Sequence, residues 1–208
     1  MVKRIIFDID NTLILFKDDF IKYYAEIFPD KDLKKAKEVY DALEFYEDEE
    51  DIYSEEAMLN FLNRKLDYDF DINMIKKINK EVAEKWVDKP DKDIISTFEY
   101  LSKKYEIYAL TNWFTDAQKR RLDKFGILKY FTKVIGTDMV KIKPNKEAYL
   151  MASNGLKMED CLFIGDSPKK DLDVPYQMGA KVIHFDNNYK NNTEYPKIRE
   201  IKELKNIL

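Results

Sequence analysis

The sequence predicts an α/β protein: a Rossmann-like parallel sheet core with helices on both faces, together with an inserted α-helical bundle. Short apolar runs recur along the chain, and each ends in polar residues. In the second half these runs alternate with helix-like stretches, which is typical of βαβ units in a parallel sheet. About a hundred residues of helical pattern separate the first run from the second. Since a simple βαβ unit needs roughly 30 residues, we expect an extra helical unit there.

Composition limits the classes of partner. The 208 residues allow one full core and a smaller accessory unit. With a net charge of -4, the chain has no basic field for nucleic acid or an anionic membrane surface. Cys161 is the only cysteine, which excludes intrachain disulfides and a multi-thiolate zinc site and favours a reducing cytoplasm. We expect a cytoplasmic protein with a small-molecule partner, and the sequence does not predict an oligomeric state.

The first predicted strand ends in two acids. Residues 5–13 read I-I-F-D-I-D-N-T-L, so Asp8 and Asp10 follow a short apolar run. These acids also interrupt the run far short of a signal-peptide core or a membrane span. Ligands bind at the carboxyl ends of strands in open α/β sheets, so both acids are expected at an active site. An aspartate-rich turn is the alternative. An EF-hand loop is excluded, because its glycine and glutamate positions hold Leu13 and Asp19.

Four amphipathic helices are predicted in the inserted stretch. Apolar residues recur at helical spacing within residues 16–27 and again within 33–43. Ser54 is expected to cap a third helix and Asp71 a fourth. Four helices without an intervening strand indicate a small bundle.

The domain boundaries follow from this insertion. We expect residues 1–15 and 90–208 to form the α/β core and residues 16–89 to form a helical cap, whose stems could act as a hinge. Pro90 breaks the helical pattern near the second boundary. The five consecutive acids at 47–51 are interpreted as a solvated connection between two helices.

The remaining strands are predicted at residues 107–110, 134–135, 161–164 and 181–183. One helix is expected to end at Gly126, a plausible C-cap, and another to span 145–153. The only histidine, His184, lies just past the last predicted strand, where a structural or solvated role is expected. Residues 189–208, which include Asn191 and Asn192, are expected to form an irregular surface tail that ends in a short amphipathic segment.

Polar residues follow four of the predicted elements: Asp8, Asp10 and Thr12; Thr111 and Asn112; Lys143; and Asp166 and Asp171. In order and spacing, the segments D-I-D-N-T, L-T-N, K-P and G-D-S-P-K-K-D resemble the haloacid dehalogenase-like (HAD) hydrolases of phosphatase type. The resemblance covers the whole chain, because the inserted helices lie where one subgroup of these hydrolases carries an α-helical cap. Each motif alone is a weak signal, but the four in this order with a cap-sized insertion are a strong one.

Phosphoryl transfer explains these residue types. The charge of a phosphate monoester repels an anionic nucleophile, so cations and hydrogen-bond donors must surround the phosphorus. Asp8 and Asp166 together make a hard oxygen site suited to Mg²⁺. The resemblance implies that these two side chains and the backbone carbonyl of Asp10 hold the metal. Asp171 is then expected to contact a residue that binds the metal, or to reach the metal through a water molecule.

The resemblance also implies separate roles for the paired acids. Asp8 is expected to attack phosphorus and form an aspartyl-phosphate. Asp10 is expected to protonate the leaving oxygen and then to activate water. Dehalogenases of the same superfamily attack carbon and lack an aspartate at the position of Asp10, so this residue favours a phosphate ester.

Three further residues are expected to contact the substrate phosphate: Thr111, Asn112 and Lys143. The first two are expected to donate hydrogen bonds and Lys143 to neutralise charge; an ordinary turn is the alternative for Thr111 and Asn112. Lys141 competes with Lys143, but the lysine of the resembled family commonly precedes proline, as Lys143 does. Thr12 is expected to brace the loop after Asp10.

The resulting hypothesis is a Mg²⁺-dependent phosphatase that acts on a small phosphorylated metabolite. Alternatives are a phosphomutase or other phosphotransferase of the same superfamily, a receiver-like phosphoacceptor, and a non-catalytic binding domain. A receiver domain would be much shorter, and a binding domain would be expected to have lost one of the acids. Phe16, Lys17 and Trp113 are the candidate specificity residues near the cleft. Tyrosines 23, 24, 40 and 46 add aromatic surface that could stack on a base, but their helical spacing favours packing in the core.

Overall fold

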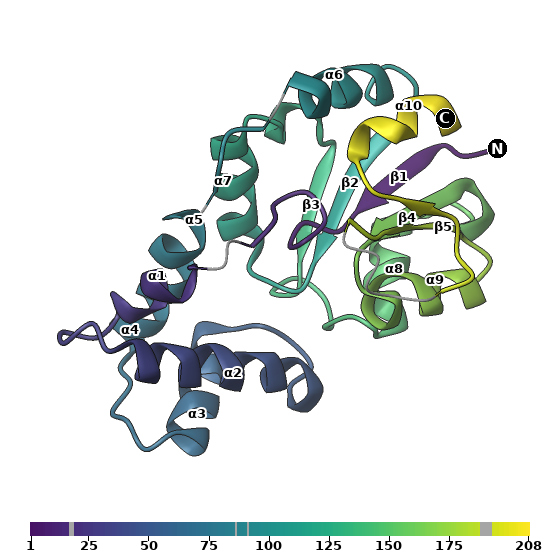
Figure 1. The fold of residues 1–208 in the computed structure, drawn as a ribbon. Coiled ribbons are helices and arrows are strands. Elements are labelled where there is room, and N and C mark those ends of the chain that lie inside the picture. The colour runs from purple at the N-terminus through teal and green to yellow at the C-terminus, as the bar shows by residue number, and fades with distance from the viewer. Residues whose placement is uncertain (17–18, 86, 91, 188–192) are drawn as a thin grey trace.

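A six-stranded, fully parallel sheet forms the centre of the computed structural model, which describes residues 1–16, 19–85, 87–90, 92–187 and 193–208 (Figure 1). Its strands lie in the order β3-β2-β1-β4-β5-β6, as in Rossmann-like proteins. They are β1 (Arg4–Phe7), β2 (Glu106–Thr111), β3 (Lys133–Gly136), β4 (Cys161–Gly165), β5 (Lys181–Phe185) and β6 (Lys197–Ile198). The predicted fold class is therefore confirmed, and the five predicted strands all form.

The register of the sheet brings three strand ends together. Phe7 of β1 pairs with Ala109 of β2 on one side and with Ile164 of β4 on the other. The polar residues that follow these strands therefore emerge at one edge. This register places Asp8 beside the ends of both neighbouring strands.

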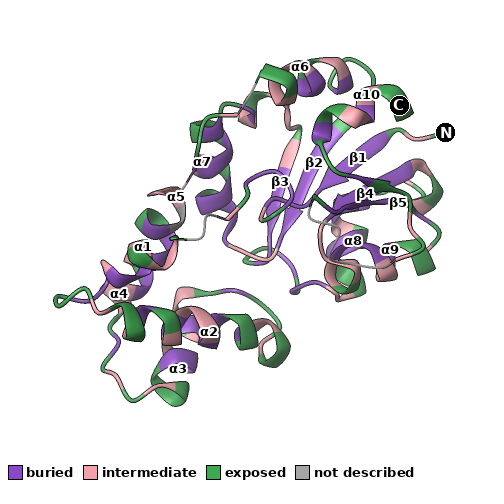
Figure 2. Ribbon diagram, in the orientation of Figure 1, coloured by how far each residue is buried: buried purple, intermediate pink, exposed green. Residues whose placement is uncertain are grey.

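Helices cover both faces of the sheet because successive strand residues point to opposite sides. They are α6 (Lys92–Leu101), α7 (Thr115–Phe125), α8 (Lys146–Ser153), α9 (Asp173–Gln177) and α10 (Leu204–Ile207). Ile5 and Phe7 pack with residues of α6, α7 and α10, whereas Ile6 packs with residues of α8. Figure 2 shows the central strands buried between these layers. As predicted, α7 ends at Gly126 in a left-handed conformation, with φ of 86°.

The C-terminal residues pack against the core, so the predicted irregular surface tail is wrong for residues 197–203. The short amphipathic segment predicted at its end forms α10. The short β6 pairs with β5, and Ile198, Ile201 and Leu204 are all buried. Ile201 and Leu204, three residues apart, form the apolar side of the C-terminal segment that packs against the core. Asn191 and Asn192 lie outside the described residues. His184 lies within β5 and is fully buried, which agrees with a structural role.

The insertion between β1 and α6 is helical throughout its described elements (Figure 1). It contains α1 (Ile21–Ala25), α2 (Leu33–Glu49), α3 (Glu55–Lys65), α4 (Ile72–Lys77), a π-helical turn (Ile78–Val82) and α5 (Ala83–Lys85). The caps form as predicted: Ser54 Oγ accepts from the Ala57 amide at 3.0 Å, and Asp71 accepts from the amides of Asn73 and Met74. The first predicted helix is shorter than expected, because only Ile21–Ala25 is α-helical.

The acidic run at 47–51 was predicted to be a solvated connection, and this is wrong for Glu47. Helix α2 continues to Glu49, and the Glu47 side chain is only 15% exposed because it faces the core. The backbone after α2 is also tied to the core, since the Asp51 carbonyl accepts from the Ile142 amide at 2.7 Å. Asp48 and Glu49 are exposed, as predicted. Across the described residues, we find no helix with the length and apolar character needed to cross a membrane.

Candidate active site

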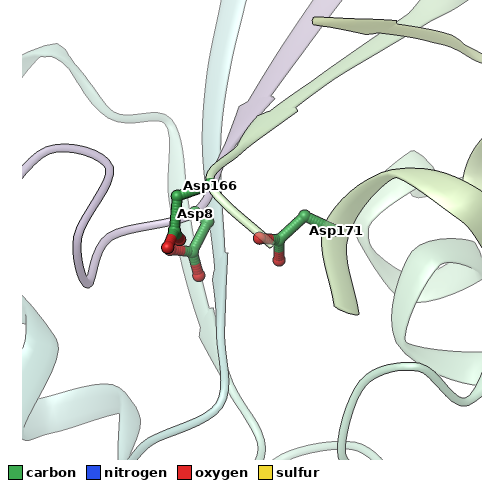
Figure 3. A group of neighbouring side chains, drawn as sticks. All are labelled: Asp8, Asp166 and Asp171. Atoms are coloured by element: carbon green, nitrogen blue, oxygen red, sulfur yellow. The ribbon is translucent and has the colours of Figure 1, made fainter. Parts of the chain in front are cut away.

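Three carboxylates converge at the carboxyl edge of the sheet. Asp8 follows β1, Asp166 follows β4, and Asp171 lies in a π-helical turn (Pro168–Leu172). One oxygen from each lies within 4.8 Å of the others, and Figure 3 shows the three carboxylates close together. Asp8 and Asp171 are buried and Asp166 is partly buried. The register of β1 and β4 is what brings residues so distant in sequence together.

Lys143 is the buried counter-ion of this cluster. Its Nζ lies 2.8 Å from Asp8 Oδ1 and 2.6 Å from Asp171 Oδ1. Burial opposes its charge, but the carboxylates of Asp171 and Asp8 raise the pKa of Lys143 well above its ordinary value. The competitor Lys141 lies at the surface, near Asp51 and Glu147. The structure thus places Lys143, and not Lys141, among the carboxylates.

The cluster retains an excess of negative charge that fits a divalent cation. Burial, followed by the neighbouring Asp171, raises the pKa of Asp166 to about 7. Burial also raises the pKa of Asp8, although Lys143 opposes this. Thr12 Oγ1 lies 3.2 Å from an Asp8 oxygen and 3.3 Å from an Asp166 oxygen, so this side chain contacts both carboxylates. Three carboxylates beside one ammonium form a set of hard oxygen donors of the kind Mg²⁺ prefers.

Protein groups bind both oxygens of Asp171, as they also do for Asp8. Oδ1 accepts from Lys143, and Oδ2 accepts from the Ser167 amide at 3.0 Å. The close approach of Asp171 requires glycine at position 165, where a Cβ atom would lie 2.4 Å from the Asp171 carboxylate. Gly165 therefore makes room for the residue that orients Lys143.

Gly165→Ala is expected to displace Asp171 and to lower the free energy of unfolding by about 1–3 kcal/mol, the usual cost of overpacking. The control is Gly155→Ala, because an added Cβ there meets nothing within 4 Å and only the left-handed backbone is strained. Both variants should lose stability in thermal melts. Only Gly165→Ala should also lose hydrolytic activity, and equal activity in the two variants would contradict the role of this glycine.

Asp10 is not part of the carboxylate cluster and contacts two residues of α7 that were not predicted from the sequence. Its Oδ1 accepts from Arg121 Nη1 and its Oδ2 from Gln118 Nε2, each at 2.6 Å. Gln118 also donates to Thr111 Oγ1 at 2.8 Å. Both α7 side chains are buried. Their spacing of three residues places them on one helical face, but polar residues of an amphipathic helix are normally expected to face solvent.

The Asn112 side chain braces the loop that carries Lys143. Its Oδ1 accepts from the Lys143 amide at 2.8 Å, while its Nδ2 donates to the Lys143 carbonyl and to Glu47. An amide nitrogen has two hydrogens, so this side chain can reach a phosphate only if one of those contacts breaks. Thr111 is buried, and its Oγ1 accepts a hydrogen bond from Gln118 Nε2.

A cavity of about 310 Å³ opens beside these groups. Phe16 and Trp113 line it, as expected for specificity residues, whereas Lys17 lies outside the described residues. Tyr24 and Tyr40 pack edge to face with ring centroids 5.9 Å apart. They belong to the hydrophobic core, as expected, and they also line the cavity.

The family model of the haloacid dehalogenase-like hydrolases matches residues 2–175. The chain belongs to this family of hydrolases, in agreement with the motifs and the fold. Among curated proteins, a pyrimidine 5′-nucleotidase, PynA, from Streptococcus pneumoniae is 26% identical over 113 residues. This match covers 52% of the chain and 48% of the nucleotidase, so the chain spans about half the length of that relative.

Solved structures of this family share the fold over nearly the whole chain. The HAD hydrolase YfnB from Bacillus subtilis, described as bound to magnesium, has a TM-score of 0.71 at 19% identity, covering 99% of this chain and 98% of its own. A HAD phosphatase from Thermococcus onnurineus has a TM-score of 0.69 at 21% identity, covering 99% and 97%. The L-2-haloacid dehalogenase from Xanthobacter autotrophicus has a TM-score of 0.71 at 14% identity, covering 100% and 98%.

Proposed function

We propose that the protein is a Mg²⁺-dependent phosphatase that hydrolyses a small phosphorylated metabolite through an aspartyl-phosphate on Asp8. The observation that carries this proposal is the division of the paired acids. Asp8 lies in the buried cluster beside Lys143, whereas Asp10 is held by Arg121 and Gln118 at the cavity. Attack on a phosphate ester uses a nucleophile and a separate leaving-group acid. A dehalogenase needs no such acid, and the similarity to a nucleotidase also supports a phosphate ester.

In the first step, an Asp8 oxygen bonds to phosphorus as the ester P–O bond breaks, and Asp10 gives its proton to the leaving oxygen. In the second step, Asp10 takes a proton from water as the water oxygen attacks phosphorus and the bond between phosphorus and the Asp8 oxygen breaks. This releases inorganic phosphate and restores Asp8. Arg121 and Gln118 orient the Asp10 carboxylate, and Lys143 offsets negative charge beside Asp8.

Asp8 and Asp166 would hold Mg²⁺, together with the carbonyl of Asp10 that the resemblance implies. When bound, the ion would neutralise charge on the phosphate oxygens. Asp171 orients Lys143, since its oxygens are engaged by the lysine and the Ser167 amide.

The helical insertion, residues 16–89, would act as a cap over the cavity and shield the aspartyl-phosphate from bulk water. Its contacts with the core support this role. The Tyr53 amide donates to the Thr137 carbonyl at 2.9 Å, and the Ile142 amide donates to the Asp51 carbonyl at 2.7 Å. Opening of the cap would break both of these main-chain hydrogen bonds.

Hydrolysis of p-nitrophenyl phosphate is expected to require Mg²⁺ and to fall by on the order of 100-fold in excess chelator, because the phosphate would otherwise meet bare carboxylates. Asp166→Asn should raise the Mg²⁺ concentration needed for half-maximal activity more than Asp171→Asn does. A colorimetric assay across a Mg²⁺ titration measures both effects. Full activity in chelator would refute the metal assignment, and the opposite order of the two variants would exchange their roles.

The ratio of inorganic phosphate to released alcohol distinguishes hydrolysis from phosphoryl transfer. A phosphatase releases inorganic phosphate in a one-to-one ratio with the alcohol. A phosphotransferase supplied with a sugar acceptor would release less phosphate than alcohol.

A further inference from the structure

Helix α2 presents two carboxylates to the same cavity as the carboxylate cluster. Glu44 and Glu47 both line the cavity and are three residues apart, so they lie on one face of the helix. The core side of the cavity holds Asp8 and Lys143, where phosphate would bind. A substrate whose phosphate binds there would place its leaving group in the cavity that Glu44 and Glu47 also line.

Glu47 is fixed in place by core and cap residues. Its carboxylate lies 2.7 Å from Lys170 Nζ and accepts from Asn112 Nδ2 at 2.8 Å and from the Tyr53 hydroxyl at 3.2 Å. Lys170 also lines the cavity, and its charge is offset by this ion pair. A negatively charged leaving group would have to compete with Glu47 for that cation.

Glu44 adds a second negative charge on the side of the cavity that α2 forms. It is exposed. Burial and the nearby Glu44 carboxylate raise the pKa of the Tyr40 hydroxyl. No salt bridge to Glu44 is found in the described part of the chain. The other cations that line the cavity, Arg121 and Lys143, are paired with aspartates. The α2 side of the cavity, with Glu44 and Glu47, therefore carries net negative charge.

We infer that Glu44 and Glu47 are specificity residues that select a leaving group without negative charge and with hydroxyl or amino donors. This inference rests on the proposed phosphatase function. Carboxylates only accept hydrogen bonds, so they favour such donors and repel a carboxylate. The rings of Tyr24, Tyr40 and Trp113 also line the cavity, and they offer apolar faces to the carbon skeleton of the leaving group.

Three two-carbon phosphate esters test this selection, because they differ mainly in the charge of the leaving group. They are 2-hydroxyethyl phosphate (neutral), phosphoethanolamine (cationic) and phosphoglycolate (anionic). The wild-type protein is expected to have its lowest kcat/KM on phosphoglycolate. Glu44→Gln and Glu47→Gln should each raise the ratio of kcat/KM on phosphoglycolate to that on 2-hydroxyethyl phosphate by on the order of tenfold, as expected for loss of one nearby charge.

The matched control is Glu49→Gln, an identical change on the same helix. Glu49 pairs with Lys65 of α3, so its replacement should leave the ratio unchanged. Because Glu44 is exposed, Glu44→Gln tests the inference even if Glu47→Gln does not fold.

The outcomes separate this inference from the proposed function. If the wild-type protein hydrolyses p-nitrophenyl phosphate but both glutamine variants keep the wild-type ratio, the selection by charge is wrong and the phosphatase proposal stands. A wild-type preference for phosphoglycolate would also overturn the inference. If none of these phosphate esters is hydrolysed, the phosphatase proposal and the inference both fail.

Discussion

Asp8→Asn is expected to reduce phosphate release by on the order of 10⁴-fold or more, the scale seen when a catalytic nucleophile is lost. The amide has nearly the same shape as the carboxylate, so the fold should persist. It is, however, a poor nucleophile, and it leaves Lys143 facing a neutral group 2.8 Å from its ammonium. Steady-state phosphate release and mass spectrometry of acid-quenched protein measure the two consequences, lost turnover and lost phosphoenzyme.

Asp10→Asn is the comparison for this variant, because it changes the other acid of the pair. We expect about 10²- to 10⁴-fold slower turnover, the usual contribution of general acid–base catalysis, with slower formation and slower hydrolysis of the phosphoenzyme. Phosphate trapped on a residue other than Asp8 would refute the mechanism. Near-normal turnover of Asp8→Asn would refute it equally.

Lys143→Met is expected to have the second large effect, on stability as well as on activity. Lys143 is 3% exposed between two buried aspartates, and loss of one member of a buried ion pair typically costs about 3–5 kcal/mol. Hydrolysis should become too slow to measure, because negative charge beside Asp8 is no longer offset. Lys141→Met is the matched control, since this side chain is 47% exposed, and surface changes of this kind stay within about 0.5 kcal/mol.

The stability of Lys143→Met should depend on pH in a predictable direction. Burial already raises the pKa of Asp8 above its ordinary value of 3.8, and Lys143 is the group that opposes this. Without the lysine, the folded protein binds protons more tightly than the unfolded chain does. The variant is therefore closest to wild type below about pH 4 and loses stability as pH rises through the folded-state pKa. Urea unfolding of the metal-free proteins at several pH values measures the free energy of unfolding. If variant and wild type differ in this free energy by the same amount at every pH, the prediction is contradicted.

The sequence predicted those parts of the fold that depend on local patterns. Apolar runs predicted five of the six strands, and the caps at Ser54 and Asp71 formed because each needs only the next few backbone amides. The motif acids were expected at one edge because parallel strands end there. The short β6 was missed, since two residues carry too little pattern to indicate a strand.

By itself, then, the sequence determined the parallel sheet, the helical insertion and the clustering of Asp8, Asp166 and Lys143. Only the tertiary structure decided which polar side chains surround that cluster. Glu47 appeared to belong to a solvated acidic run, yet it contacts Asn112, 65 residues away. Arg121 was not predicted to have a role from the sequence, yet it binds Asp10, 111 residues away. The physical reason is that a charged side chain is buried only where a distant partner offsets its desolvation, and packing alone determines where that partner lies.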